Sequence, residues 1–363
     1  MPATANTNLE KTCRIHELKP DYEQACRRWE AFWQGEIIDR PVISVVAPRD
    51  GRNLYNQGLL CQNDKIAEAV ERANAWIEGQ YWGGDAIPRI WPNPGPDIFA
   101  AWLGAHLVDA LDASTNWVEP CVESWEQALP LRLDKQNPHW KRTMAYLEAL
   151  AARATGRWVV AGLDLHSNLD ALSAIRSPQQ LCMDLLDQPE NVERALRDMR
   201  ALYGPVSEAM FKAGNAKVTG SMGWIPMYSK KKYNVVQCDF CYMISPELFR
   251  RFVLPALEEE VSWLDHSVYH LDGPGALRHL NDLLALPRLN AIQWVPGAGA
   301  KPLCEWLDVL KKIIAAGKNV HVYCPVEQVE LFHRALGPRR VFYECWAKNE
   351  AEARRVVEWL EKN

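Results

Sequence analysis

Short apolar runs alternate with longer amphipathic stretches along most of the chain. The runs are rich in β-branched and aromatic residues and have the length of β-strands. They predict strands at 41–48, 86–91, 157–165, 216–221, 235–242, 267–272, 291–295, 319–324 and 340–345. The intervening stretches repeat apolar residues at helical spacing and predict helices at 21–35, 63–81, 189–214, 245–265, 302–317 and 349–363.

Strands that alternate with helices indicate βαβ units and a parallel sheet. Ser245 before Pro246 is typical of a helix start, and Gly317 is typical of a helix end. About eight such units fit a chain of 363 residues. We therefore predict one (β/α)₈ TIM barrel domain over 1–363, with 1–40 as an N-terminal helical extension. A doubly wound open sheet is the alternative, but no G-x-G-x-x-G or Walker motif follows a strand to indicate a nucleotide site.

Composition narrows the class of protein. With 48% hydrophobic and 24% charged residues the chain is typical of globular proteins, and its net charge of -5 argues against non-specific nucleic-acid binding. No apolar run reaches the roughly 20 residues that cross a membrane, and no secretory signal is visible. The ten cysteines are scattered. We therefore expect reduced thiols in a cytoplasmic protein, and we do not expect Cys238 and Cys241 to form a redox or zinc pair.

Polar side chains gather where the predicted strands end, and in a barrel the active site forms at the carboxyl ends of the strands. Those residues are Arg49, Asp50, Arg52, Trp91, Asn93, Asp164, His166, Asn168, Asp239, Cys241, His270, Asp272, Gln293, Trp294, Cys324, Glu344 and Cys345. Any one of them is more often a capping or packing residue. Their presence after nearly every strand favours an enzyme with a polar cavity.

The most specific candidates among these residues are His270, Asp272 and Cys345. Residues two apart on a strand share a face, so His270 and Asp272 are expected to point into one site. Imidazole, carboxylate and thiolate all bind zinc, and three protein ligands with one open position are typical of catalytic zinc. Two alternatives stay open: Asp272 caps the helix that follows Gly273, and Cys345 is a buried apolar thiol.

Four segments carry a resemblance to a known family. They are "DRPVISVVAPRDGR" (39–52), "VVQCDFCYMISPELFRRFVLPALEEEV" (235–261), "VYHLDGPGALRHLNDL" (268–283) and "VFYECWAKNEAEARRVVEWL" (341–360). The chain resembles the uroporphyrinogen decarboxylase-like superfamily, specifically around 235–280 and loosely elsewhere. The resemblance implies a (β/α)₈ barrel.

The same resemblance implies one of two chemistries. True uroporphyrinogen decarboxylases carry two arginines after the first strand and a histidine on the last strand. In this chain Pro48 and Cys345 stand at the positions of the first arginine and of that histidine. The other branch comprises methyltransferases that hold zinc through His-x-Cys and a later cysteine, and that work with corrinoid proteins. His270 and Cys345 match this pattern, while Asp272 replaces its middle cysteine.

The leading hypothesis is a zinc-dependent methyltransferase that transfers a methyl group between a corrinoid on a partner protein and a thiol or related acceptor. Zinc is expected on His270, Asp272 and Cys345, and Asp239 is expected to act as an acid or an orienting group. The expected substrate-binding residues are Arg49, Arg52, Asp164, His166, Trp224, Tyr228, Gln293 and Trp294.

Two alternative functions remain. The first is a metal-independent decarboxylase or other lyase, in which Arg49 and Arg52 clamp carboxylates while Asp239 or His270 moves the proton. The second is a non-catalytic barrel that binds a tetrapyrrole or corrinoid. A small-molecule substrate is expected in the enzymatic cases, and a homodimer is the assembly kept open.

Overall fold

A computed structural model describes residues 11–49, 65–109 and 115–363, so Asp50 and Arg52 lie outside the described residues. Its central sheet has seven strands in the order β2-β1-β13-β12-β11-β10-β9, all parallel to their neighbours except β2. The strands are β1 (Val42–Pro48), β2 (Gln80–Gly84), β9 (Tyr233–Gln237), β10 (His266–Asp272), β11 (Ala291–Val295), β12 (Asn319–Tyr323) and β13 (Val341–Trp346).

Six shorter strands form three separate pairs. β3 (Arg89–Ile90) runs parallel to β6 (Val159–Val160), while β4 (His106–Asp109) with β5 (Asn116–Glu119) and β7 (Ser221–Met222) with β8 (Tyr228–Ser229) are antiparallel. The amide of Gly162 donates to the carbonyl of Met222 at 2.7 Å, which links the end of β6 to β7. Within the described residues the main sheet is not closed. The fold is therefore mixed α/β with a central, mostly parallel sheet, and the predicted closed barrel is not established.

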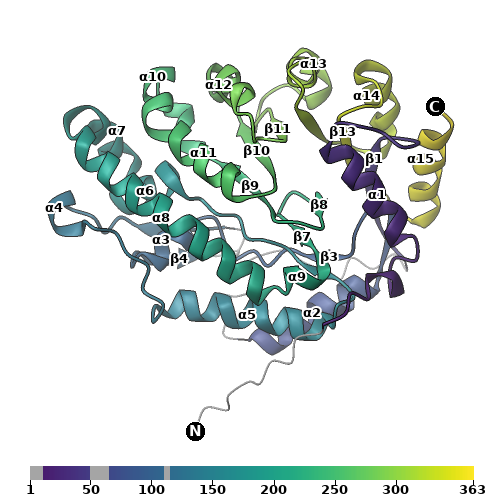
Figure 1. The fold of residues 1–363 in the computed structure, drawn as a ribbon, viewed down its shortest axis with the longest axis horizontal. Coiled ribbons are helices and arrows are strands. Elements are labelled where there is room, and N and C mark those ends of the chain that lie inside the picture. Colours follow the sequence, from purple (N-terminus) through teal and green to yellow (C-terminus); the bar gives the residue numbers. More distant parts are fainter. Residues whose placement is uncertain (1–10, 50–64, 110–114) are drawn as a thin grey trace, which may run out of the picture.

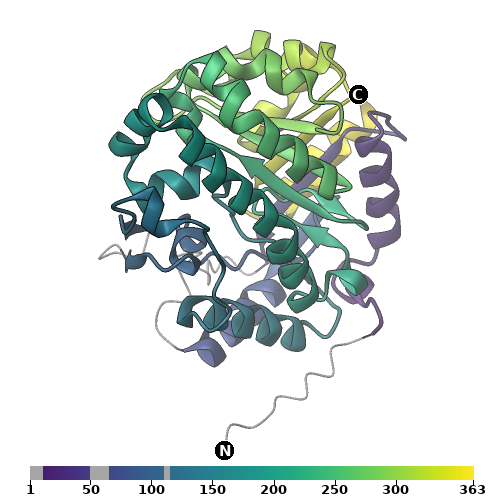
Figure 2. The same ribbon diagram turned by 60° about the vertical axis from the view of Figure 1, so that its left-hand side comes forward.

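Helices surround the sheet, most of them on its outer side and the first on its inner core (Figures 1 and 2). They are α1 (Tyr22–Trp33), α2 (Ile66–Glu78), α3 (Ile98–Trp102), α4 (Trp125–Ala128), α5 (Pro138–Ala154), α6 (Asn168–Arg176), α7 (Pro178–Asp187), α8 (Pro189–Ala213), α9 (Ala216–Thr219), α10 (Pro246–Leu248), α11 (Leu254–Trp263), α12 (Leu280–Ala285), α13 (Leu307–Ala315), α14 (Val329–Leu336) and α15 (Glu350–Lys362). A 3₁₀ segment, η2 (Asp239–Met243), follows β9. None of the described helices is long and apolar enough to cross a membrane.

The two faces of the sheet bury different hydrophobic cores. Val341, Tyr343 and Cys345 on β13 belong to the large core between strands and helices. Phe342, which alternates with them, belongs to a smaller inner core, where its ring centroid lies 4.8 Å from that of Trp29 on α1. Because side chains on a strand alternate between faces, this packing fixes which residues of β13 point inward.

Most predicted strands are present, with four local differences. The strands predicted at 86–91 and 157–165 are reduced to Arg89–Ile90 and Val159–Val160. The predicted strand at 216–221 is mainly the short helix α9, and only its end joins β7. The predicted strand at 235–242 ends at Gln237, and η2 contains Cys241. Short apolar runs fit a buried helix turn as well as a strand, so periodicity alone cannot separate the two.

Candidate functional site

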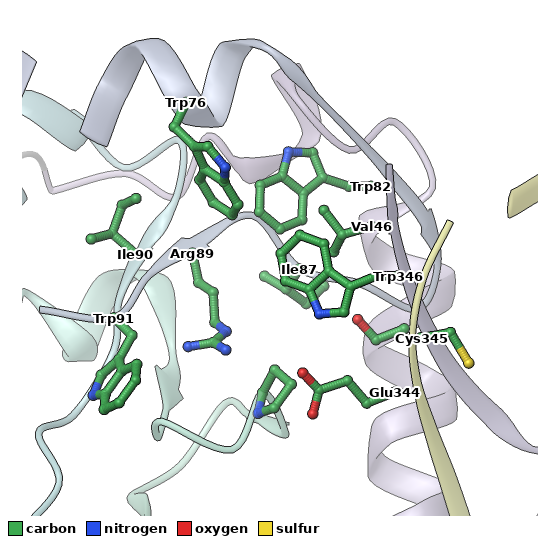
Figure 3. A pocket seen from close by; sticks show the side chains of 12 residues that line it. Val46, Trp76, Trp82, Ile87, Arg89, Ile90, Trp91, Glu344, Cys345 and Trp346 are labelled. Atoms are coloured by element: carbon green, nitrogen blue, oxygen red, sulfur yellow. The ribbon is translucent and has the colours of Figure 1, made fainter. Parts of the chain in front are cut away.

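A narrow pocket opens at the carboxyl ends of β1, β3 and β13 (Figure 3). Its cavity volume is only about 20 Å³. Arg89 from β3 and Glu344 from β13 both point into it, with Trp91 and Trp346 at its sides. A cation and an anion thus face one pocket at the end of the sheet where the sequence predicted a site.

A line of polar side chains crosses four neighbouring strands beside this pocket. Nδ1 of His270 on β10 lies 2.5 Å from Oε1 of Gln293 on β11. Nε2 of Gln293 lies 2.9 Å from Nδ1 of His321 on β12. Nε2 of His321 lies 2.9 Å from Oε2 of Glu344 on β13. Gln293 and His321 are buried, so this polar line is held away from bulk water.

The order of donors along the polar line follows from Glu344. Nε2 of His321 makes no hydrogen bond of good geometry, but the negative charge of Glu344 at 2.9 Å favours the hydrogen of His321 on Nε2 and leaves Nδ1 as an acceptor. Gln293 then donates its amide to His321 and accepts from Nδ1–H of His270. In the neutral ring, Nε2 of His270 is then the acceptor nitrogen.

Aromatic rings and Arg89 surround His270. The ring of Trp224 meets His270 edge to face at 4.9 Å, and Trp91 lies 6.2 Å from Trp224. Arg89 donates to the carbonyl oxygens of Gly223 at 3.3 Å and Trp224 at 3.2 Å. The guanidinium therefore holds the Trp224 segment against the imidazole.

A second group of polar residues centres on His166, after β6. Its Nε2 lies 3.6 Å from Asp164 and its Nδ1 lies 4.0 Å from Asp170. Burial opposes the charging of His166, but the contact with Asp164 and the charges of Asp170 and Asp239 outweigh it and raise the pKa of His166 to about 10. His166 is therefore an imidazolium at neutral pH.

The carboxylates around His166 also affect one another. Burial, and then the charge of Asp239, raise the pKa of Asp170 to about 6. Asp170 accepts from the backbone amides of Asp239 at 3.0 Å and Phe240 at 2.8 Å, which places the start of η2 beside His166. Burial raises the pKa of Asp272 as well, with the charge of Asp239 adding to the rise and that of His270 opposing it. Through Asp239 the acidic group reaches the His270 side of the site.

The structure brings together seven of the residues predicted from the sequence. These are Asp164, His166, Trp224, Asp239, His270, Asp272 and Gln293.

Three other predicted substrate-binding residues lie elsewhere, which corrects their expected place in the cavity. Tyr228 is buried in the inner core, with its hydroxyl 2.6 Å from that of Tyr22 on α1. Trp294 points to the helix side and packs on Trp306 at 5.2 Å. Arg49 is exposed and lines a separate groove beside β2 and α15.

The three predicted zinc ligands do not meet. Cys345 is 1% exposed in the core between the sheet and the helices, and its sulfur points away from the pocket in Figure 3. A hydrogen bond with Cys324 and burial raise the pKa of the Cys345 thiol well above its usual range. Across the described ranges no three His, Cys, Asp or Glu residues are arranged to hold a metal ion. Cys345 therefore does not fit as a third ligand for His270 and Asp272.

Arg89, Asp170 and His321 were missed by the sequence reasoning, and Glu344 was noted only as a strand-end residue. His321 and Glu344 alternate with apolar residues on adjacent strands, which is a usable signal for inward-facing polar groups. Arg89 lies inside a predicted strand, and a charged residue at such a position also indicates a special environment.

Comparison with known proteins gives a fold relationship. No family model matches the chain, and no curated protein matches it in sequence. Among solved structures it is similar to a methyltransferase from Methanosarcina mazei, with a TM-score of 0.61 and 14% sequence identity over 93% of this chain and 98% of that one. The two proteins share a fold along nearly their whole lengths.

Proposed function

We propose that this protein is a methyltransferase whose acceptor binds at the carboxyl ends of the central strands. The observation that carries the proposal is the shared fold with a methyltransferase over 93% of the chain, at a TM-score of 0.61. The polar side chains around His270 support it, because sheets of this kind bind their ligands at this edge. Along with the activity we propose that β3 and β6 complete a (β/α)₈ barrel of the uroporphyrinogen decarboxylase-like type.

In the proposed reaction His270 is the general base. Its Nε2 accepts the proton of the acceptor's thiol or amine group. The acceptor atom forms a bond to the methyl carbon, and the bond between that carbon and the donor breaks, leaving its electron pair on the donor. The contact of Gln293 with Nδ1 of His270 orients the ring and leaves Nε2 as the acceptor nitrogen of the neutral imidazole.

A zinc ion and a corrinoid-carrying partner remain separate predictions. His270 and Asp272 lie on one face of β10, but Cys345 is on the opposite side of β13, so no step above depends on a metal. Metal analysis of protein purified without a histidine tag tests the first prediction. Decarboxylation has less support, because Arg49 faces another groove.

The experiment that tests the proposal supplies free methylcobalamin with an isotopically labelled methyl group as the donor, together with a panel of small thiols and amines. Mass spectrometry identifies the methylated product. We expect transfer by the wild-type protein and at least a hundredfold loss in His270→Ala. His106→Ala is the matched control, since this exposed histidine pairs with Glu119 on a distant hairpin. Absence of transfer to every acceptor, or full activity in His270→Ala, would contradict the proposal.

A further inference from the structure

The His166 side of the cavity carries more carboxylates than positive groups. Asp164, Asp170 and Asp239 all act on His166, which supplies one positive charge. Asp272 adds a fourth carboxylate next to Asp239. Asp170 is buried, Asp164 is half-buried, and Asp239 and Asp272 are exposed, so the group presents an excess of negative charge that attracts a cation.

Gln237 adds an independent sign of a missing ligand. It is the last residue of β9, pairs in register with His270 on β10, and is 2% exposed. Tyr233 and Val235 of the same strand face the inner core, so alternation places the Gln237 side chain on that inner face. Its Oε1 has no hydrogen-bond partner among the described residues. A buried acceptor without a donor is costly, and a ligand that donates a hydrogen bond removes the cost.

Three more polar atoms of the site residues are buried without a partner in the described part of the chain. They are Oδ1 of Asp164 and the indole nitrogens of Trp91 and Trp224. Oδ1 of Asp164 calls for a donor, as does Oε1 of Gln237. The indole N–H groups of Trp91 and Trp224 are donors, so they call for an acceptor instead.

We propose that the substrate of this site carries a positively charged nitrogen with N–H groups, that is, a protonated amine. The nitrogen donates to Oε1 of Gln237 and Oδ1 of Asp164, and its charge offsets the carboxylates around His166. A protonated amine fits better than an inorganic cation, because the described residues hold no metal-binding group of three and two indole rings border the site. The inference rests on the proposed methyl transfer and names the substrate class for it.

Three probes of nearly equal size test the charge requirement: propylammonium, propanol and propionate. Their dissociation constants are measured at neutral pH by ligand-observed NMR, which detects millimolar binding. Propylammonium is expected to bind at least about tenfold more tightly than propanol, since hydrogen bonds to charged groups are stronger than neutral ones. Propionate is expected to bind least. Equal binding of the three probes, or tightest binding of propionate, would overturn the inference.

Two variants locate the binding. Asp164→Asn and Gln237→Met are each expected to weaken propylammonium binding about tenfold. Gln237→Met removes an acceptor that has no partner, so the variant should unfold at the same temperature as the wild type or at a higher one. Its affinity for propylammonium should nevertheless fall. Asp282→Asn is the matched control, because Asp282 pairs with Arg250 on the outer helices at 3.0 Å. Wild-type binding by both site variants would overturn the assignment.

The assay of methyl transfer separates this inference from the proposed function. Selective binding of propylammonium without transfer to any acceptor would contradict the methyltransferase and leave the charge preference standing. Methyl transfer to acceptors that bind equally well whatever their charge would support the methyltransferase and contradict the charge preference.

Discussion

Polar groups are paired differently on the two sides of the site, along β10 to β13 and around His166. Along β10 to β13 the polar line joins His270, Gln293, His321 and Glu344 in one direction. Around His166, between β6 and η2, carboxylates outnumber the positive groups that act on them. On the first side close polar contacts link each group to the next. The second side carries an excess of negative charge that attracts a cation. We infer that the first side serves the chemistry and the second serves recognition.

Of the substitutions that test this difference, Asp170→Ala is expected to have the largest effect, on the stability of the fold. Asp170 holds η2 beside His166 by accepting two backbone amides, at 3.0 and 2.8 Å. Removal leaves two buried donors unsatisfied and should lower the free energy of unfolding by about 3 kcal/mol. Denaturant unfolding measures the loss. Asp308→Ala, an exposed helix position, is the control, and equal stability of the two variants would show that Asp170 does not position η2.

The next effect concerns the far end of the polar line. In Glu344→Gln the side chain no longer requires a donor from His321, so both tautomers of His270 become populated. We expect methyl transfer to fall about tenfold with little change in stability. ¹⁵N NMR of the imidazoles should show His270 protonated at Nδ1 in the wild type and a mixture in the variant. Glu327→Gln, on the exposed surface, should match the wild type. An unchanged His270 tautomer in Glu344→Gln would break the proposed order of donors.

A buried carboxyl behind the acidic side gives a pH-dependent prediction. Glu260 accepts from Oγ of Ser167 at 2.7 Å, and burial raises its pKa to about 7. A raised carboxyl pKa stabilises the fold fully below the unfolded value, and this contribution is lost as the pH rises from about 4.5 through 7. The loss is at most about 3 kcal/mol. Glu260→Gln should lack this component in unfolding measured between pH 5 and 8, and identical profiles would contradict the prediction.

The smallest effect is expected from Cys345→Ala, which tests whether Cys345 is part of the site. Cys345→Ala removes a buried thiol from the helix-facing core and should cost about 1 kcal/mol of stability. Methyl transfer and the metal content per chain should stay at wild-type levels. Depletion of zinc in this variant, but not in Cys324→Ala, would instead restore Cys345 as a ligand.

The strands that alternate with long helices could be predicted from the sequence, because their periodicity reflects burial on both faces of the sheet. The phase of a strand was harder to predict. In "VFYECW" either Glu344 or Cys345 must face inward, and the resemblance favoured Cys345. Contact between Phe342 and Trp29, far apart in the chain, selects Glu344.

Two further differences have the same physical origin. Gln293 and Trp294 are adjacent on β11, so both cannot line one cavity, and Trp294 takes the helix side. Tyr228 is placed by its hydroxyl contact with Tyr22 across 206 positions. Long-range packing of this kind leaves no local pattern in the sequence. His270 with Asp272 could be assigned to one face because their spacing alone decides it.

Steady-state kinetics of methyl transfer to an amine acceptor tests most directly whether one side carries out the chemistry and the other binds the substrate. His270→Ala should lower kcat at least a hundredfold with little change in KM, because the base acts on the reacting atoms. Asp164→Asn should raise KM about tenfold with kcat largely retained, because its carboxylate binds the charged nitrogen. A loss confined to KM in His270→Ala, or to kcat in Asp164→Asn, would contradict the assignment of chemistry to one side and recognition to the other.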